Sequence, residues 1–261
     1  MTNPCPTAFV ALGERLADAA RDVVLRHFRQ PIGIIDKVDE SPVTIADRDA
    51  ETAMRGLIAA AFPDHGTIGE EYGSDRPGAE YVWVLDPIDG TKAFLSGVPI
   101  FGTLISLLRD GRPILGIIDQ PVTGERWIGA AGRPTTLGGK PVRAATRGGL
   151  RDAVLWTTSP YMFETDADDA AAYDRLRRQV KFVHFGGECY QFAMLASGFI
   201  DLVVEGDLDP YDFMALVPVV EGAGGVMSDW QGRPLGLDSD GRVIAAADPA
   251  LHRAALKVLA R

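Results

Sequence analysis

Two carboxylates stand three residues apart in the segment Asp86-Pro87-Ile88-Asp89-Gly90-Thr91, directly after the apolar run YVWVL. That run predicts a strand, and reactive groups often lie where a strand ends. The proline favours a turn between the aspartates and the glycine allows close backbone approach, so both carboxylates and the Ile88 carbonyl could converge on a hard cation. Oxygen-only ligands favour Mg²⁺. The alternative is a turn in which Asp86 and Asp89 only accept hydrogen bonds from backbone amides.

Two further acidic positions could join this pair from other parts of the chain. Glu70 follows the strand-like segment HGTIG, and Asp212 stands at the start of a predicted helix in DPYDFMALVPVVEGAGG. Each has an ordinary structural alternative, because a pair such as Glu70-Glu71 can lie in a solvated turn and an aspartate at a helix start can cap backbone amides. Their occurrence together with DPIDGT favours a shared metal site.

The composition narrows the range of partners. The chain has 261 residues and a formal net charge of −10, with 46% hydrophobic and 24% charged residues. The length and hydrophobic fraction are typical of a globular protein with a sizeable core. The negative charge argues against binding to nucleic acid or to an anionic membrane surface. An acidic protein can still bind phosphate when bound cations reverse the local field.

Cysteine and histidine usage favours oxygen ligands. The two cysteines, Cys5 and Cys189, are far apart and lack CxxC spacing, and the four histidines are scattered. This pattern supports neither a zinc knuckle nor a disulfide framework. The segment MTNPCPTAFVALGERL has no long apolar run, so we expect neither a signal peptide nor a membrane span, and we expect a cytoplasmic location.

The first half of the chain is predicted to be α+β. Apolar residues at three- and four-residue steps predict a helix over residues 7–29, and a second helix is predicted over residues 44–62, where Thr44 and Asp47 resemble a capping box. Strand-like runs follow at residues 81–85, 100–108, 113–119 and 126–131 and in the segment KPVRAA. The Asp110-Gly111 pair predicts a hairpin between two of these strands.

The second half changes to an alternating rhythm. The predicted strands AVLWTT, KFVHF, FIDLVVE, GVMSDW and RVIAAA alternate in part with helices near residues 166–180, at 188–197, from about 210 and at the end of the chain. Such alternation predicts βαβ units and an α/β half. We place a boundary at residues 148–151. An N-terminal half, residues 1–148, then holds most candidate ligands, and a C-terminal half, residues 149–261, holds Asp212 and the substrate-selecting residues.

Taken together, these segments resemble the inositol monophosphatase-like phosphatases. The matching pieces are GEE at 69–71, WVLDPIDGT at 83–91, PYDFMALVPVVEGAGG at 210–225 and the helix start with Asp47, and the resemblance extends from about Leu16 to Leu256. It implies a layered αβαβα sandwich and a homodimer. It also implies two or three Mg²⁺ ions and hydrolysis of small-molecule phosphate monoesters by a metal-activated water.

The resemblance also implies a role for each candidate residue. The carboxylate ligands of the metal ions would be Glu70, Asp86, Asp89 and Asp212. The Ile88 carbonyl would be a further ligand, and Gly90 and Thr91 would contact the phosphate. Glu70 would also be catalytic, and Thr91 together with Asp47 would orient and deprotonate the attacking water. The expected reaction is an in-line displacement without a covalent intermediate, in which one ion activates water and another stabilises the leaving alkoxide. For Asp47, helix capping alone is the alternative.

Within this family, two segments look most like the histidinol-phosphate phosphatases of histidine biosynthesis: IFGTLISLLRDGRPILGIIDQPVTGERWIG and GGECYQFAMLASGFIDLVVEGDLDPYD. Histidinol phosphate carries an ammonium and an imidazole beside its phosphate, so its pocket benefits from an anionic side chain. Glu188 and Glu205 are the candidates, with Asp212 as a third substrate contact. An ordinary helix-start carboxylate is the alternative for Glu188, and Asp209 is either a supporting residue or a turn residue.

Two departures from the family pattern leave other substrates open. Lys92-Ala93 replaces the threonine and asparagine usual in inositol phosphatases, although Lys92 also resembles branches acting on phosphoadenosine, and Tyr211 replaces a usual tryptophan. Inositol-1-phosphate phosphatase and 3′-phosphoadenosine nucleotidase are therefore alternatives, and a non-catalytic metal-binding protein is a third. The glycine patterns of dinucleotide-binding and P-loop proteins are absent. The composition of residues 30–44, with Gly33 and the charged stretch IDKVDESP, suggests the hypothesis of a mobile segment that closes over the site.

Overall fold

The computed structural model describes residues 4–30, 35–36, 42–145 and 147–260. Its helices are α1 Thr7–His27, α2 Ile45–Ala61, α3 Thr91–Leu95, α4 Ala167–Arg177, α5 Glu188–Ala196, α6 Pro210–Phe213, α7 Leu216–Gly222 and α8 Pro249–Leu259. Its strands are β1 Ile35–Asp36, β2 Pro42–Val43, β3 Gly66–Gly69, β4 Gly73–Asp75, β5 Tyr81–Asp89, β6 Gly102–Arg109, β7 Arg112–Gln120, β8 Glu125–Ala130, β9 Thr136–Leu137, β10 Lys140–Pro141, β11 Val154–Thr157, β12 Phe182–Phe185, β13 Leu202–Glu205, β14 Val226–Asp229 and β15 Val243–Ala246.

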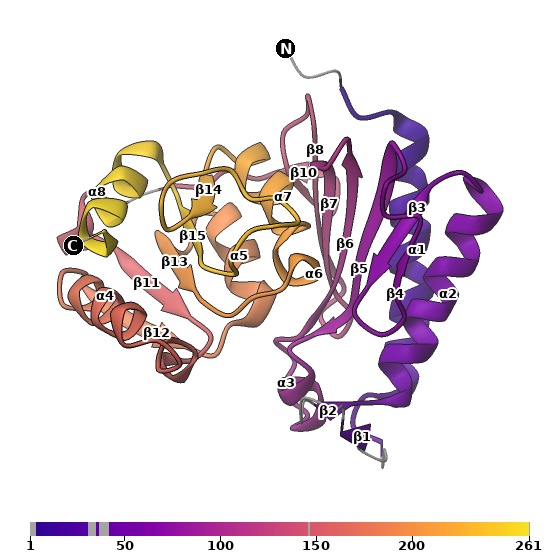
Figure 1. Cartoon of the computed structure of the whole chain (residues 1–261), viewed down its shortest axis with the longest axis horizontal. Coiled ribbons are helices and arrows are strands. Elements are labelled where there is room, and N and C mark those ends of the chain that lie inside the picture. Colours follow the sequence, from indigo (N-terminus) through magenta and orange to yellow (C-terminus); the bar gives the residue numbers. More distant parts are fainter. Residues whose placement is uncertain (1–3, 31–34, 37–41, 146, 261) are drawn as a thin grey trace.

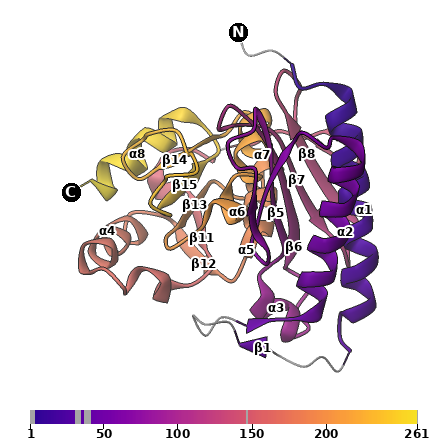
Figure 2. The same ribbon diagram turned by 45° about the vertical axis from the view of Figure 1, so that its right-hand side comes forward.

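Helices and sheets alternate in layers across the molecule (Figure 1). Helices α1 and α2 cover one face of an eight-stranded sheet, and α5 and α7 lie between this sheet and a five-stranded one. Helices α4 and α8 form the outer layer beyond the second sheet. The turned view in Figure 2 shows α1 and α2 as one layer against the strands β5 to β8. The predicted αβαβα sandwich is therefore confirmed.

The two sheets differ in topology, as the change of rhythm in the sequence indicated. The large sheet has the order β10-β9-β8-β7-β6-β5-β3-β4, and its only described parallel pair is β3 with β5. The small sheet has the order β12-β11-β13-β15-β14. Strand β11 is parallel to both neighbours, as expected of βαβ units, whereas β15 is antiparallel to β13 and β14.

The predicted local signals explain the elements nearest the candidate site. The buried residues of α1, including Leu12, Leu16 and Val23, recur at three- and four-residue steps and face the large sheet. Helix α2 begins after Thr44 with the predicted capping box. The β6–β7 hairpin turns at Asp110 and Gly111, whose φ angles of 50° and 75° match the turn that such a pair favours.

Three predicted elements differ from the structure. The helix predicted from Pro210 is two helices, α6 and α7, because Pro218 has no N–H to bond the Met214 carbonyl, which instead accepts a hydrogen bond from Ser106 Oγ at 3.2 Å. The strand predicted in KPVRAA is limited to β10. The strand predicted in FIDLVVE begins only at Leu202, after the turn at Gly198, whose φ is 83°.

The two halves pack closely on each other. The last strand of the large sheet ends at Pro141 and the first strand of the small sheet begins at Val154, but α7 packs against β7 and β8 of the large sheet. The boundary at residues 148–151 stays a prediction. The closing segment predicted at residues 30–44 lies largely outside the described residues.

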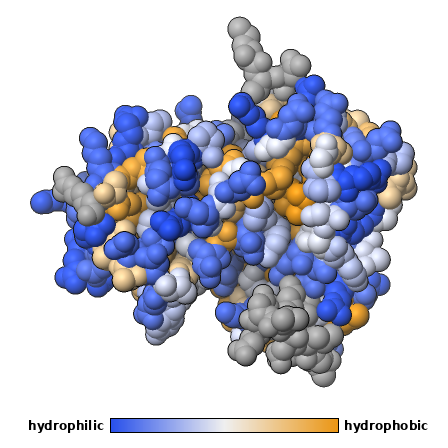
Figure 3. Space-filling model, in the orientation of Figure 1, coloured by the Kyte–Doolittle hydropathy of each residue, from blue (hydrophilic) through white to orange (hydrophobic). Residues whose placement is uncertain are grey.

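The hydropathy of the surface and of the helices fits the mixed composition of the chain. On the face in Figure 3, hydrophilic residues predominate and hydrophobic residues show in smaller areas, several of them near the centre. No described helix is both long enough and apolar enough to span a membrane.

Candidate active site

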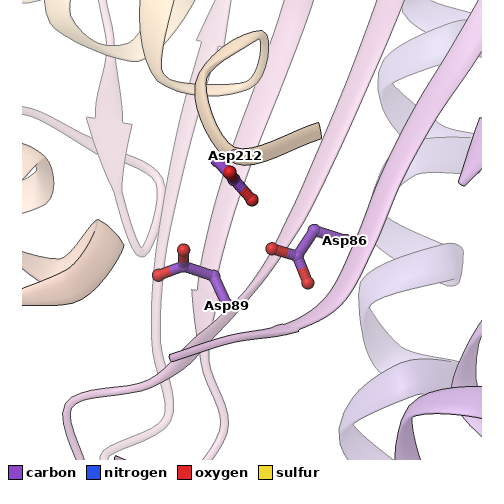
Figure 4. A group of neighbouring side chains, drawn as sticks. All are labelled: Asp86, Asp89 and Asp212. Atoms are coloured by element: carbon purple, nitrogen blue, oxygen red, sulfur yellow. The ribbon is translucent and has the colours of Figure 1, made fainter. Parts of the chain in front are cut away.

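Three aspartates from distant parts of the sequence converge between the two sheets. Asp86 and Asp89 lie on β5, and Asp212 lies on α6. One carboxylate oxygen from each lies within 4.8 Å of one from each of the others. Figure 4 shows the three side chains gathered in one small region, two of them from β5 and one from α6. The structure thus brings together three of the four carboxylates that were predicted to bind metal.

A bulge in β5, and not a turn after it, sets the spacing of the first two aspartates. The strand runs on to Asp89, and its register with β6 shifts between Asp86 and Asp89. Bulges commonly re-aim side chains next to active sites. The Pro87 carbonyl accepts a hydrogen bond from Thr103 Oγ1 at 2.8 Å, and the Ile88 N–H donates to Asp86 Oδ1 at 3.0 Å. The predicted turn is therefore corrected to a bulge, because Pro87 occupies a position where no ladder N–H is required.

Helix termini hold the other two members of the cluster. The N–H of Cys189, in the first turn of α5, donates to Asp89 Oδ2 at 2.6 Å. Asp212 forms a reciprocal capping box with Asp209, whose N–H donates to Asp212 Oδ2 at 2.7 Å. The hydrogen bonds from backbone amides that the alternative interpretation predicted are therefore present. They hold Asp89 and Asp212 in the cluster. The sequence analysis missed the contribution of the Cys189 N–H. It left open a supporting role for Asp209, and the spacing of Asp209 and Asp212 is a capping signal.

Glu70 and Asp47 lie in the electrostatic neighbourhood of the cluster. Burial and then the negative charge of Glu70 raise the pKa of Asp86, and Glu70 is also among the causes that raise the pKa of Asp212 and of Asp47. Asp47 Oδ2 accepts hydrogen bonds from Thr44 N at 2.9 Å and Thr44 Oγ1 at 2.6 Å, as the capping interpretation predicted. A second role for Asp47 in orienting water stays a prediction.

The cluster has the electrostatics of a cation site. Burial raises the pKa of Asp86 and Asp212 well above the ordinary range and that of Asp89 to about 6, and neighbouring carboxylates add to each shift. Among the described residues, no lysine or arginine forms an ion pair with these three aspartates. Asp86 is buried, and Asp89 and Asp212 are half-buried. Like charges this close together require a counter-charge, and an all-oxygen donor set matches Mg²⁺. The residues present therefore fit the predicted metal ions.

The phosphate-binding residues that were predicted begin a short helix beside the cluster. Gly90 has a φ of 84°, which favours glycine, and it precedes Thr91, the first residue of α3. Thr91 Oγ1 donates to the Ile88 carbonyl at 3.1 Å. A Cβ on Gly90 would lie 2.7 Å from Glu188 Cγ, so this position adjoins the predicted substrate-selecting residue. Contact of Gly90 and Thr91 with phosphate stays a prediction.

A pocket of about 120 Å³ opens directly beside the cluster. Asp89 and Asp212 line one part of it, and Glu188 and Glu205 add two more carboxylates. Its other lining residues are Thr158, Met162, Cys189, Gln191, Phe192, Leu208 and Leu216. The described lining therefore combines acidic and apolar side chains and includes no lysine, arginine or histidine.

The two glutamates are held in different ways. Glu188 begins α5 with a φ of 46°, a strained value for a residue other than glycine. Burial and the charge of Asp89 raise its pKa to about 7, whereas Lys92 lowers it. Glu205 ends β13 and is only 2% exposed. Its Oε1 accepts hydrogen bonds from Thr158 N at 2.6 Å and Gln191 Nε2 at 2.5 Å, and burial raises its pKa to about 8. Sequence reasoning missed Thr158 and Gln191.

Curated relatives align with most of the length of this chain. A chloroplastic bifunctional phosphatase from Arabidopsis thaliana is 49% identical over 260 residues, which are 96% of this chain and 75% of the relative. A histidinol-phosphatase from Chlorobaculum parvum is 35% identical over 92% of both chains. A histidinol-phosphatase from Mycobacterium tuberculosis is 32% identical over 83% of this chain and 85% of the relative.

Solved structures show the same fold. An inositol monophosphatase from Zymomonas mobilis has a TM-score of 0.89 and 47% identity over 97% of both chains, and one from Anabaena has a TM-score of 0.85 and 28% identity over 97% of this chain and 96% of the other. The model of the inositol monophosphatase family matches residues 7–261. That family is metal-dependent, typically on Mg²⁺, and acts on small-molecule phosphate esters, as the acidic cluster leads one to expect. The protein therefore belongs to the inositol monophosphatase family of phosphatases.

Proposed function

We propose that the protein hydrolyses L-histidinol phosphate to L-histidinol and inorganic phosphate. In this proposal Glu70, Asp86, Asp89, Asp212 and the Ile88 carbonyl hold two or three Mg²⁺ ions. Two observations support the metal site. The three aspartates converge, and the negative charge of Glu70 raises the pKa of Asp86 and of Asp212.

One observation carries the choice of substrate: the pocket beside the cluster has two more carboxylates than the predicted metal site requires. Glu188 and Glu205 lie in its lining, and no cationic side chain of the described lining neutralises them there. Burial raises the pKa of both; the charge of Asp89 adds to the shift of Glu188, and the charge of Glu188 adds to the shift of Glu205. A substrate that carries an ammonium or imidazolium group would place a positive charge beside both carboxylates, whereas a neutral polyol would leave the buried Glu205 and the half-buried Glu188 without one in the pocket.

The proposed mechanism divides the work among the residues of the chain. When bound, Mg²⁺ would supply activation of water and neutralisation of the charge on the reacting phosphate. Asp47 and Thr91 would orient that water and accept its proton, and the backbone at Gly90 would approach the phosphate closely. Glu188, Glu205 and Asp212 would hold the amino-alcohol part of the substrate. The Cys189 N–H and the Asp209 N–H keep two of the carboxylates in place.

The names of the relatives support two candidate substrates. The curated relatives from Chlorobaculum and Mycobacterium are called histidinol-phosphatases, whereas the Zymomonas structure at 47% identity is described as an inositol monophosphatase. Inositol 1-phosphate is therefore the second candidate. The acidic pocket favours histidinol phosphate, because a hydroxyl group forms weaker bonds to carboxylates than an ammonium does.

The direct test is Mg²⁺-dependent phosphate release from L-histidinol phosphate, with inositol 1-phosphate and 3′-phosphoadenosine 5′-phosphate assayed on the same preparation. A strong preference for histidinol phosphate supports the proposal. Preference for another ester would keep the metal site but refute the substrate. No release from any of the three would leave the fold without the proposed activity.

Replacing Glu188 with glutamine is expected to raise KM for histidinol phosphate about tenfold, because it removes a partly buried charge facing the ammonium. KM for inositol 1-phosphate should change little. Steady-state kinetics on both esters measure the difference. Glu125→Gln is the matched control, since Glu125 accepts a hydrogen bond from Tyr190 of α5 at 2.7 Å but does not line the pocket. An equal rise in KM for both esters would contradict the assigned role.

Location and assembly are further parts of the proposal. Cys5 and Cys189 are buried free thiols, which is compatible with a reducing cytoplasm. The family resemblance supports a homodimer, which light scattering on the purified protein would detect.

A further inference from the structure

Glu51 is a buried carboxylate that lies one helical turn after Asp47 on α2. Its side chain is fully buried. Its Oε2 accepts a hydrogen bond from the N–H of Glu71 at 2.8 Å, and its Oε1 accepts one from the N–H of Tyr72 at 3.3 Å. Both donors belong to the connection between β3 and β4, and this connection also carries Glu70. The Glu51 side chain thus hydrogen-bonds to the backbone immediately after Glu70, a predicted metal ligand.

Arg55, one turn further along α2, forms hydrogen bonds to the two strands that flank the same connection. Its Nε donates to Glu51 Oε1 at 2.7 Å, which balances the buried charge. Its Nη1 donates to Thr67 Oγ1 on β3 at 2.7 Å, and its Nη2 donates to the Gly73 carbonyl on β4 at 2.5 Å. The Glu51–Arg55 pair therefore fixes the β3–β4 connection to the face of α2 that bears Asp47.

Gly69 is required for this contact. A Cβ on Gly69 would lie 2.1 Å from Glu51 Oε1 and 2.7 Å from Glu51 Oε2, closer than real atoms approach. Any other residue at this position would displace the Glu51 carboxylate. On the opposite side, the N–H of Glu70 donates to the Leu85 carbonyl of β5 at 3.3 Å. Glu70 is thus held between α2 and the strand that carries Asp86.

We propose that Glu51 is a positioning residue that fixes Glu70 relative to Asp86, so that Glu70 binds Mg²⁺ together with the three aspartates of the cluster. This inference rests on the proposed role of Glu70 as a metal ligand. Groups that orient a ligand through hydrogen bonds contribute about tenfold or more to metal affinity. Glu51 acts through the backbone of the connection, and nothing places it on the metal itself.

The test is Mg²⁺ titration of the metal-free full-length protein by calorimetry. Glu51→Gln keeps the volume of the side chain but replaces one acceptor oxygen with a donor, and Gly69→Ala disturbs the same contact from the other side. Each is expected to raise the Kd for Mg²⁺ about tenfold. Because Glu51 acts through Glu70, Glu51→Gln should add no further loss in a Glu70→Gln background. Circular dichroism of each variant establishes that it folds, and Gly69→Ala serves if Glu51→Gln does not.

Asp201→Asn is the matched control. Asp201 is also fully buried, accepts hydrogen bonds from the N–H groups of Arg147 and Val154 at 2.8 Å, and pairs with Arg147, but it lies just before β13 and away from α2. It should lower the melting temperature without changing the Kd for Mg²⁺. Wild-type Kd values for Glu51→Gln and Gly69→Ala, with a raised Kd for Glu70→Gln, would overturn the inference and spare the metal site. A wild-type Kd for Glu70→Gln would overturn both.

Discussion

Replacing Asp89 with asparagine is expected to lower kcat/KM for any phosphate ester that the protein hydrolyses by about a thousandfold or more. The substitution removes one negative charge from the three converging aspartates, and a metal ion supplies several kcal/mol of transition-state stabilisation, of which about 4 kcal/mol corresponds to a thousandfold. Phosphate release at saturating Mg²⁺ measures the effect. Near-normal turnover would show that the metal assignment is wrong.

The same variant should keep its fold, which separates loss of chemistry from loss of structure. Asparagine retains an oxygen that can accept the N–H of Cys189. Burial raises the pKa of Asp89 from 3.8 to about 6, so the folded state loses stability as the pH rises from 3.8 to about 6 and stays destabilised at higher pH. In EDTA at pH 7.5 or so, Asp89→Asn is therefore expected to melt at a higher temperature than the wild type. A lower melting temperature would mean that the carboxylate contact with α5 outweighs the repulsion.

Replacing Glu205 with glutamine is expected to lower kcat/KM for histidinol phosphate about a hundredfold and to change kcat/KM for inositol 1-phosphate much less. Glu205 is almost fully buried, and removing one partner of a buried, hydrogen-bonded charge pair costs about 2 to 5 kcal/mol. Kinetics on both esters give the ratio. Asp201→Asn is the control, because Asp201 is a buried carboxylate just before the other end of the same strand. Parallel losses on both esters would indicate a structural role only.

Glu205 also predicts a pH dependence of stability. Its pKa in the folded protein is raised to about 8, above the unfolded value of 4.5, so the unfolded state releases its proton first. The contribution of Glu205 is therefore retained below pH 4.5 and falls by a few kcal/mol as pH rises toward 8. Urea denaturation of wild type and Glu205→Gln between pH 5 and 9 should show the wild type losing stability relative to the variant. Parallel curves would contradict the raised pKa.

Much of the site was predictable from local sequence because it depends on short segments with strong preferences. The capping signal at Thr44 and Asp47 fixed the start of α2, and the apolar run before Asp86 fixed β5. The hairpin at Asp110 followed from a turn pair with positive φ angles. Such features depend on neighbouring residues only, so they are legible without the fold.

Other features could not be read locally because each depends on atoms far apart in the chain. Pro218 is a local signal for the break between α6 and α7, but the donor that satisfies the Met214 carbonyl there is Ser106, more than a hundred residues away. The bulge in β5 depends on its register with β6. Gly69 had no role of its own in the sequence; the structure shows that the Glu51 carboxylate occupies the space that a side chain would need there.

By itself, the sequence determined the α+β and α/β character of the two halves through hydrophobic periodicity. Its short motifs supplied the acidic residues available for metal binding and the resemblance that implied the family and its layered fold. Only the tertiary structure decided which backbone groups hold these residues. Asp89 depends on the N–H of Cys189, Glu205 on the amide of Gln191, and the connection bearing Glu70 on Glu51. Hydrogen bonds need donor and acceptor within about 3 Å, and only folding brings such distant partners that close.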